Sequence, residues 1–559
     1  MNTLDKILLR FFLLPVAFYR KVGIDKPQLE AILSAKLTMD NRRPLAFARL
    51  GRRGEKKELN TATLKTMVFS LLMGFFLIAG IKIGEDMVTR LTVFISTYLI
   101  MLCLMLIADF TSVLIDVRDN YIILPKPVTD ATFLMSRLLH IAIRVCVVMV
   151  PLSLPTCLMA CVQEGWTLFL PFLLVILLSS LFGIFLINAV YILILKMMDP
   201  VKFQSAISYF QIVFTVMVFA GYQMLPVLIN KFGLLHASVL VLQNRWLYPP
   251  FWFADACMAI QGMDFSNGKF VSVALALFVP LFSLWLVIRY LAPFFNQKMT
   301  LIAAGSAEQS RAVVKKQKRK LGEKLASFFT KPGAEYVGFV FCWKMMFRSR
   351  DFKLKVYPSF GSAFVLCVLF LYNFGENSFL PKGEALWLSL LLIIYICCLI
   401  PMTALMQLPY SEKFKASWVF HAMPIESPGV VIAGAVKAAL VFTFIPLALI
   451  LFPLGFYIIG FRIFPDLLLG CVNVLAISSV FGLIFVRKMP FSLAMDAATN
   501  AGSIFRPLLM LSVPFAFGFL HWRISGSMTM VLLFMSFSVL ISWLFFKKVR
   551  NLDWKSITP

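Results

Sequence analysis

The run TLFLPFLLVILLSSLFGIFLINAVYILIL, residues 167–195, contains no charged side chain. An α-helix needs roughly 20 apolar residues to cross the ~30 Å hydrocarbon core of a bilayer, and this run is long enough to do so. About a dozen such runs occur in the chain. Of all residues 60% are hydrophobic and only 14% are charged. With a mean hydropathy of +0.87, so much apolar surface does not fit inside a water-soluble core. The sequence therefore predicts an all-α polytopic membrane protein.

The apolar runs fall into two groups of six, which predicts about twelve transmembrane helices as two six-helix repeats. The expected spans cover residues 65–82, 91–115, 138–160, 167–195, 207–229 and 271–291, followed by 357–373, 385–407, 430–459, 463–486, 505–521 and 527–546. Five regions result: a cytosolic or interfacial N-terminal segment (1–64), a first half (65–292), a basic cytosolic linker with a second entry segment (293–356), a second half (357–546) and a cytosolic tail (547–559).

An amphipathic stretch precedes the first span of each half. Leu29–Arg43 and Tyr336–Arg350 each place apolar residues before a lysine, Lys36 or Lys344, and arginines follow several residues later. Such a stretch can lie in the membrane interface with its apolar face inward and its basic groups at phosphate level. We expect two interfacial helices. The alternative is that each stretch is only the charged flank of the next span.

Basic residues indicate the orientation, because positively charged loops are retained in the cytoplasm. The expected outer loops hold only eight of the 53 lysines and arginines, and the linker contains the dense run Arg311–Lys324. We therefore expect both termini to be cytosolic and the protein to lie in a bacterial cytoplasmic (inner) membrane. Nucleic acid is not an expected partner, because the basic residues flank membrane spans, where anionic lipid explains them. The eight outer residues are Lys82, Arg90, Lys231, Arg245, Lys269, Lys382, Arg462 and Arg523.

Two segments share one pattern: YIILPKPVTDATFLMSRLLH, residues 121–140, and WVFHAMPIESPGVVIAGAVK, residues 418–437. Each follows the second span of its half and places a proline six residues after an aromatic residue. A basic or titratable residue then stands thirteen positions beyond the proline. The corresponding pairs, each separated by 297 residues, are Tyr121 and Trp418, Pro127 and Pro424, and His140 and Lys437.

Proline chemistry predicts that these segments form stiff turns. Pro125 and Pro127 fix their φ angles and remove two backbone donors, and Pro424 does so once. A side-chain oxygen of Thr129 or Asp130, and of Glu426 or Ser427, can cap the helix that follows. A stiff, capped turn on the cytosolic side is suited to docking another protein, and the alternative is a tight turn without a partner. The copies differ, since Lys126 corresponds to Met423.

The chain lacks the motifs of common enzymes. No GxxxxGK[ST] loop is present to bind nucleotide phosphates. Its four histidines, His140, His236, His421 and His521, are dispersed, and no HExxH, paired CxxC or GxSxG pattern occurs. We expect no enzymatic activity, no metal and no cofactor bound by this chain.

Asp109, in LMLIADFTSVLID (residues 104–116), is the ionisable residue deepest within a predicted span. A charge in hydrocarbon costs several kcal/mol unless it is paired or hydrated. Asp109 is therefore a candidate functional residue that faces a translocation path or pairs with Arg144. The alternative is a structural ion pair or a residue at the cytosolic boundary.

The loop between the fifth and sixth spans, Lys231–Val271, is unusually rich in aromatic residues. It contains the stretch YPPFWFA at Tyr248–Ala254. Aromatic side chains favour the headgroup zone of a bilayer. We expect this loop to pack on the outer membrane surface.

Several stretches resemble the permease subunits of ABC-type exporters that carry a duplicated six-span unit. They are the entry stretch Lys36–Arg43, the loop Asp119–Arg137, its partner Lys415–Gly434 and the aromatic stretch Tyr248–Ala254. The resemblance covers nearly the whole chain by architecture, on loose patterns. In that family the loop after the second span forms a coupling helix that sits in a cleft of the ATPase subunit. The resemblance assigns that role to Tyr121, Pro125, Lys126, Pro127, Thr129 and Asp130, and to Trp418, Pro424, Ile425, Glu426 and Ser427.

The resemblance also implies a mechanism. Two copies of a separate, soluble ATPase subunit bind ATP, close, and move both turns together, so that the two halves shift and an unidentified substrate is exported between them. The ATP would be bound by the partner subunits and not by this chain.

Two other classes compete with this interpretation. Secondary transporters of the major facilitator type also have a six-plus-six architecture and are driven by an ion gradient. Their loop after the second span follows roughly GxLaDrxGrr, whereas residues 116–127 here read DVRDNYIILPKP without glycine. A membrane-bound enzyme or a lipid flippase without an ATPase is the second rival, and the lack of a convergent catalytic set speaks against it.

Overall fold

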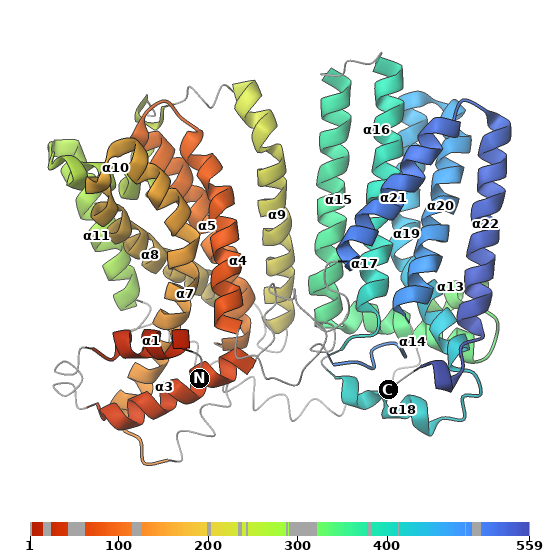
Figure 1. The fold of residues 1–559 in the computed structure, drawn as a ribbon, viewed down its shortest axis with the longest axis horizontal. Helices are drawn as coiled ribbons and strands as arrows, with labels where there is room; N and C mark the ends of the chain where they lie inside the picture. The colour runs from red at the N-terminus through yellow and green to blue at the C-terminus, as the bar shows by residue number, and fades with distance from the viewer. Residues whose placement is uncertain are drawn as a thin grey trace. The chain divides into compact units, whose positions relative to one another are not determined.

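A computed structural model describes residues 3–14, 24–42, 62–113, 126–197, 203–232, 238–241, 244–286, 289, 321–376, 382–411, 413–486, 488–494 and 505–557. Two compact units divide the chain (Figure 1). The first comprises Met1–Arg49, Glu55–Ile207 and Leu225–Ala312, and the second comprises Leu50–Gly54, Ser208–Met224 and Val313–Pro559.

Regular structure in the described ranges is helical. In these ranges, β pairing is limited to an isolated parallel bridge between Tyr410 and Leu493. Among the residues that the structure describes, eleven helical segments are long and apolar enough to cross a membrane. The remaining expected span, 505–521, corresponds to α21 (Phe505–Ile524), whose apolar part Leu508–Ile524 is shorter. These helices agree with the predicted all-α polytopic membrane protein.

The first unit contains the spanning helices of the N-terminal part of the chain and two helices that lie across their ends (Figure 1). Leu29, Leu33 and Leu37 are buried at helical spacing and pack against Ile143 and Val147. The expected stretch before the first half therefore forms a helix with one buried face. The helices are α1 (Thr3–Phe12), α3 (Lys26–Arg42), α4 (Ala62–Leu77), α5 (Met87–Val113), α7 (Asp130–Glu164), α8 (Phe169–Met197), parts of α9 (Phe203–Phe232), α10 (Pro249–Gly262) and α11 (Asn267–Leu286).

The centre of the aromatic loop forms a helix, α10, with one buried face. Two prolines, Pro249 and Pro250, begin α10, where their missing N–H groups cost nothing. Phe251 and Phe253 are fully buried where α10 packs against α5, α8 and α11. Phe251 and Phe253 thus fill the core of the first unit, whereas Tyr248 is 46% exposed.

The second unit has the same kinds of element. The expected span 385–407 is interrupted at Cys398, because Pro401 has no N–H to donate to the carbonyl of Cys397. The helices are the middle of α9 (Ser208–Met224), α13 (Leu321–Phe329), α14 (Ala334–Arg348), α15 (Arg350–Glu376), α16 (Lys382–Cys397), α17 (Leu399–Gln407), α18 (Trp418–Ala422), α19 (Pro428–Ile459), α20 (Phe464–Phe485), α21 and α22 (Met528–Arg550).

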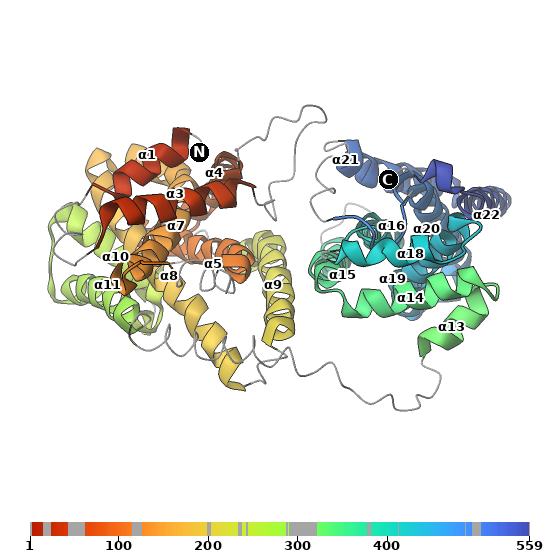
Figure 2. The ribbon, with the colours of Figure 1, turned by 90° about the horizontal axis from the view of Figure 1, so that it is seen from below.

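Helix α14 lies across one end of the second unit, beside α13 and α18 (Figure 2). Its buried side chains, Phe339, Cys342 and Met346, recur at helical spacing, so the second entry stretch also forms a helix with one buried face. At Gly338 and Gly434 the backbones of α14 and α19 come so close that a Cβ at either position would overlap the other helix. The two glycines therefore fix how the entry helix crosses the helix that follows the second turn.

Candidate functional site

The second proline turn (Trp418–Ser427) is described completely and forms a short helical corner. A 3₁₀ turn, Phe414–Ser417, leads into α18, and an extended segment from Met423 to Ser427 leads into α19. Met423 ends α18 with φ −86° and ψ 145°, the extended conformation that a following proline imposes. The turn lies at the same end of the unit as α14 and the C-terminus (Figure 1).

One face of the turn packs inward. The ring of Phe420 meets Phe341 of α14 edge-on, with centroids 5.5 Å apart. His421 lies against Trp554, with centroids 5.1 Å apart, and Ile425 packs on the buried core of the unit. The turn is thus held against both the entry helix and the C-terminal segment (Val549–Ile557).

The opposite face is apolar and exposed. Trp418, Val419 and Met423 have exposed fractions of 65%, 37% and 52%. Lys413, Lys415 and Glu426 are exposed nearby. A contiguous apolar tip of this kind, rimmed by polar residues, is typical of an interaction surface.

The C-terminal segment replaces the expected side-chain cap of α19. Ser427 stands at the N-cap, but its side chain does not cap the helix, which corrects that prediction. Its hydroxyl instead donates to the carbonyl of Arg550 at 3.2 Å, and the N–H of Gly429 donates to the carbonyl of Leu552 at 3.1 Å. Pro428 at the first helical position has no N–H that needs a partner. The next free N–H, that of Gly429, is satisfied by a main-chain carbonyl of the C-terminal segment.

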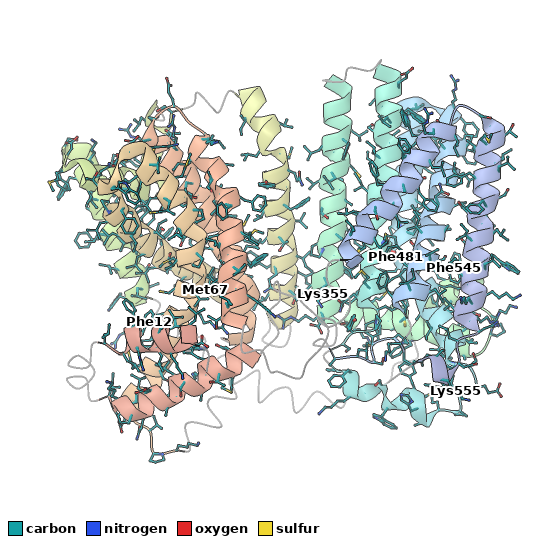
Figure 3. The ribbon with its side chains drawn as sticks, viewed as in Figure 1. Phe12, Met67, Lys355, Phe481, Phe545 and Lys555 are labelled. Carbon is teal, nitrogen blue, oxygen red and sulfur yellow. The ribbon has the colours of Figure 1, made fainter. Side chains whose placement is uncertain are left out.

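Trp554 fastens the same segment to the turn. Its indole N–H donates to the carbonyl of Ile425 at 2.9 Å. Figure 3 labels the neighbouring Lys555, on the segment that follows α22. The main chain of the turn is therefore fixed immediately after Pro424 by a residue 129 positions later in the chain.

Tyr121 and Pro125 of the first proline turn (Tyr121–Asp130) lie outside the described residues, and the side chain of Asp130 is not described either. Lys126, Pro127 and Thr129 are described and exposed. Thr129 is the N-cap of α7 and accepts a hydrogen bond from the N–H of Thr132, as predicted. The carbonyl of Pro127 accepts from the side chain of Gln28 at 3.4 Å, so this turn also contacts the entry helix of its own unit.

Pro127 and Pro424 share one local geometry. The N–H of Val128 donates to the carbonyl of Lys126 at 2.7 Å, and the N–H of Ile425 donates to that of Met423 at 2.8 Å. In both places the proline is the central residue of a three-residue turn, whose φ matches the value that the ring fixes.

The residues thirteen positions beyond the two prolines both pair with a buried carboxylate of the entry helix. His140 Nε2 lies 2.6 Å from Asp40 of α3, to which Arg144 Nε also donates at 2.8 Å. Lys437 Nζ lies 2.7 Å from Glu335 of α14. These pairs join each entry helix to the helix that follows its turn.

The charge balance at Asp40 is favourable despite burial. Burial by itself would raise the pKa of the carboxyl group. The hydrogen bond with His140 and the positive charge of Arg144 outweigh that effect, so the pKa of Asp40 lies below its ordinary value of 3.8. The carboxylate is therefore ionised at neutral pH.

The backbone of Asp109 lies in α5, but its side chain is outside the described residues. Arg144, the expected partner of Asp109, binds Asp40. Where the structure describes side chains, no group of three or more His, Cys, Asp or Glu residues is arranged to hold a metal ion.

Three important residues are not recognisable from the sequence. Asp40, Glu335 and Trp554 are each distant in the chain from the residues that they contact. The one available signal was the amphipathic pattern of the two entry stretches, which contain Asp40 and, just before the second, Glu335.

Comparisons with protein-family models, with curated proteins and with solved structures gave no match.

Proposed function

We propose that this chain is the membrane-spanning permease subunit of an ABC-type exporter, driven by separate ATPase subunits. The observation that carries the proposal is the second proline turn, which presents an exposed apolar tip while its opposite face and main chain are held in place. Trp418 is 65% exposed, whereas Phe420 and Ile425 pack inward.

A rigid exposed tip is suited to receiving force from a partner. Tryptophan is enriched among the residues that dominate binding energy at protein interfaces. A preorganised turn loses little conformational freedom on binding, so more of the contact energy remains for association. In this proposal Trp418, Val419 and Met423 enter a cleft of the ATPase subunit.

The matched geometry of the two turns supports a duplicated unit. Pro127 and Pro424 each centre the same hydrogen-bonded turn, and His140 and Lys437 each reach the entry helix of their unit. Two ATPase subunits would each engage one turn on the cytosolic side of an inner membrane, with both termini of the chain on that side. The tips differ, since Lys126 stands where the second turn has Met423, so the two contacts would be unequal.

ATP hydrolysis would take place on the partner, because no phosphate-binding loop occurs in this sequence. Closure of the ATPase pair would push both turns. Since α14 contacts α19 at Gly338 and Gly434, movement of the second turn would be passed to α14 and α19 together. The substrate is not identified by these features.

The test is co-purification from native membranes in mild detergent, with the full chain as bait. We expect a soluble subunit that contains an ATP-binding cassette, identified by its peptide sequence, together with ATPase activity. Trp418→Ala should lower the co-purified ATPase at least tenfold, because the exposed anchor is removed. Trp543→Ala is the matched control, since Trp543 is 57% exposed but lies on the spanning helix α22. Transport that continues without an ATPase and follows a proton or sodium gradient would contradict the proposal.

One feature favours the alternative of an ion-coupled secondary transporter. His521 is fully buried and its Nε2 lies 3.3 Å from Asp466, so a titratable pair joins two helices of the second unit. A proton-coupled carrier would use such a pair. His521→Gln should then abolish gradient-driven uptake in energised vesicles, whereas in an exporter it should leave the ATP dependence of transport intact.

A further inference from the structure

A chain of polar side chains crosses four helices of the second unit. Asp466 of α20 accepts one hydrogen bond from the indole N–H of Trp387 of α16 at 3.0 Å and lies 3.3 Å from Nε2 of His521 of α21. His521 Nδ1 lies 3.0 Å from the hydroxyl of Tyr395 of α16. The chain continues through Asn473 of α20 to Ser538 of α22, at 2.7 Å and 2.6 Å. The hydroxyl of Tyr395 is therefore hydrogen-bonded to both His521 and Asn473.

The ring of Tyr395 borders an apolar groove between α16 and α21. The groove encloses about 260 Å³, and all of its lining side chains are apolar or aromatic. Gly518 allows the close approach of the two helices, because a Cβ there would stand 3.1 Å from the ring of Tyr395. The lining that matters here is Leu392, Tyr395 and Ile396 of α16 with Pro514, Gly518 and Trp522 of α21.

The length of the groove matches one leaflet of a bilayer. It extends along α21 from Met510 to Trp522. At 1.5 Å rise per residue this stretch is about 18 Å long. Half of a ~30 Å hydrocarbon core is about 15 Å. A groove of that length on spanning helices suits a single acyl chain that runs from the interface towards the midplane.

A cation stands beside one end of the groove. The guanidinium of Arg523 lies over the ring of Trp522, 6.0 Å from its centroid. This distance is at the limit of about 6 Å for a cation–π contact. Arg523 is exposed and follows directly on the last lining residue. Tryptophan and arginine together are typical of the headgroup level of a bilayer. The groove therefore offers hydrocarbon along its length and a positive charge at its mouth.

We propose that the groove between α16 and α21 binds one acyl chain of a bilayer phospholipid, with the lipid phosphate at Arg523. The polar chain behind Tyr395 holds α16 and α21 in the spacing that keeps the groove open. Binding of this lipid requires no ATPase partner, so it can be tested independently of transport.

The experiment uses the full chain in vesicles of phosphatidylethanolamine and phosphatidylglycerol that contain a trace of phospholipid with a photoreactive acyl chain. After illumination, lipid-modified peptides are quantified by mass spectrometry. We expect the modification to concentrate on peptides from Leu388–Leu399 and Met510–Trp522, at least fivefold above peptides from α22.

Two variants test the parts of the proposal. Leu392→Trp fills the groove and should reduce modification of α21 to the level of α22, and Leu533→Trp, on the exposed face of α22, is its control. Arg523→Gln should lower the modification of α21 several-fold, whereas Arg462→Gln, an exposed arginine in another loop, should not. Even labelling of all lipid-facing helices, or labelling of α21 that survives Leu392→Trp, would overturn the proposal. Unchanged labelling in Arg523→Gln would overturn the assignment of the phosphate.

Discussion

Lys437 of α19 and Glu335 of α14 form an ion pair at 2.7 Å, with the side chain of Glu335 only 4% exposed. Lys437 also donates to the carbonyl of Phe329 at 3.0 Å. The pair therefore connects three segments at the end of the second unit that carries the second proline turn. A buried carboxylate of this kind depends on its partner.

Removing Lys437 should destabilise the second unit. Lys437→Met leaves the Glu335 carboxylate buried without its cation, and we expect a loss of about 2 kcal/mol, below the ~3–5 kcal/mol of fully buried pairs because Lys437 is 31% exposed. The double variant Glu335→Gln with Lys437→Met should recover part of that loss. Thermal unfolding in detergent measures both.

The control for this pair is Lys344→Met. Lys344 pairs with Glu323 at 3.3 Å, and both side chains are more exposed. Its loss should cost less than about 0.5 kcal/mol. Equal effects of Lys344→Met and Lys437→Met would show that burial of Glu335 does not matter.

Trp554→Phe should loosen the second proline turn without changing the spanning helices. The substitution keeps an aromatic ring beside His421 but removes the donor to the carbonyl of Ile425, a loss of about 1 kcal/mol. Hydrogen exchange of the peptide 414–430 should then be about fivefold faster. Trp543→Phe, on α22, is the control and should leave exchange in that peptide unchanged.

Gly434→Ala should disturb the crossing of α14 and α19. Its methyl group would overlap the carbonyl of Glu335, which belongs to the main chain and cannot rotate away. We expect a loss of about 1–3 kcal/mol, as for other overpacked sites. Gly221→Ala is the matched control, because Gly221 lies within α9 with nothing near its Cβ position. There alanine should stabilise by about 0.5–1 kcal/mol. Similar unfolding temperatures for the two variants would rule out a tight crossing.

Acid should weaken the contact between α3 and α7. Because the pKa of Asp40 lies below its ordinary value of 3.8, the ionised carboxylate stabilises the folded state fully above that value. This contribution is lost as the pH falls through the lowered pKa of the folded protein. Asp40→Asn should therefore lower the unfolding temperature at pH 7 and flatten its decline below about pH 4.

Unfolding temperatures from pH 7 to pH 3 measure the effect. Asp553→Asn, an exposed aspartate of the C-terminal segment, should behave like the natural protein. A decline that is equally steep in Asp40→Asn would mean that other carboxyl groups cause the acid sensitivity.

The helices could be predicted from the sequence because apolar run length is a local property. The run at 167–195 appears as α8, and the leucines of 29–37 form the buried stripe of α3. Local chemistry also gave the cap at Thr129 and the tight turns at Pro127 and Pro424.

Contacts between distant residues could not be predicted in this way. Ser427 is a residue type that often caps helices, yet its side chain does not cap α19. The carbonyl of Leu552 accepts from the free N–H of Gly429 instead, because the C-terminal segment lies against the turn. The sequence suggests Asp109 as the partner of Arg144. The packing of α3 on α7 instead brings Asp40 into contact with Arg144. Phe251 and Phe253 of α10 are buried because neighbouring helices cover them, which their composition does not reveal.

The bond between Trp554 and Ile425 spans 129 residues of chain. During synthesis, α18 and Pro424 leave the ribosome long before Trp554 does, at ≈ 5–20 residues per second. For several seconds, while α19 to α22 are being synthesised, the second turn therefore lacks the hydrogen bond from Trp554 to the carbonyl of Ile425. If the proposed ATPase subunit recognises only the fastened turn, it would dock after Trp554 has been synthesised and not before.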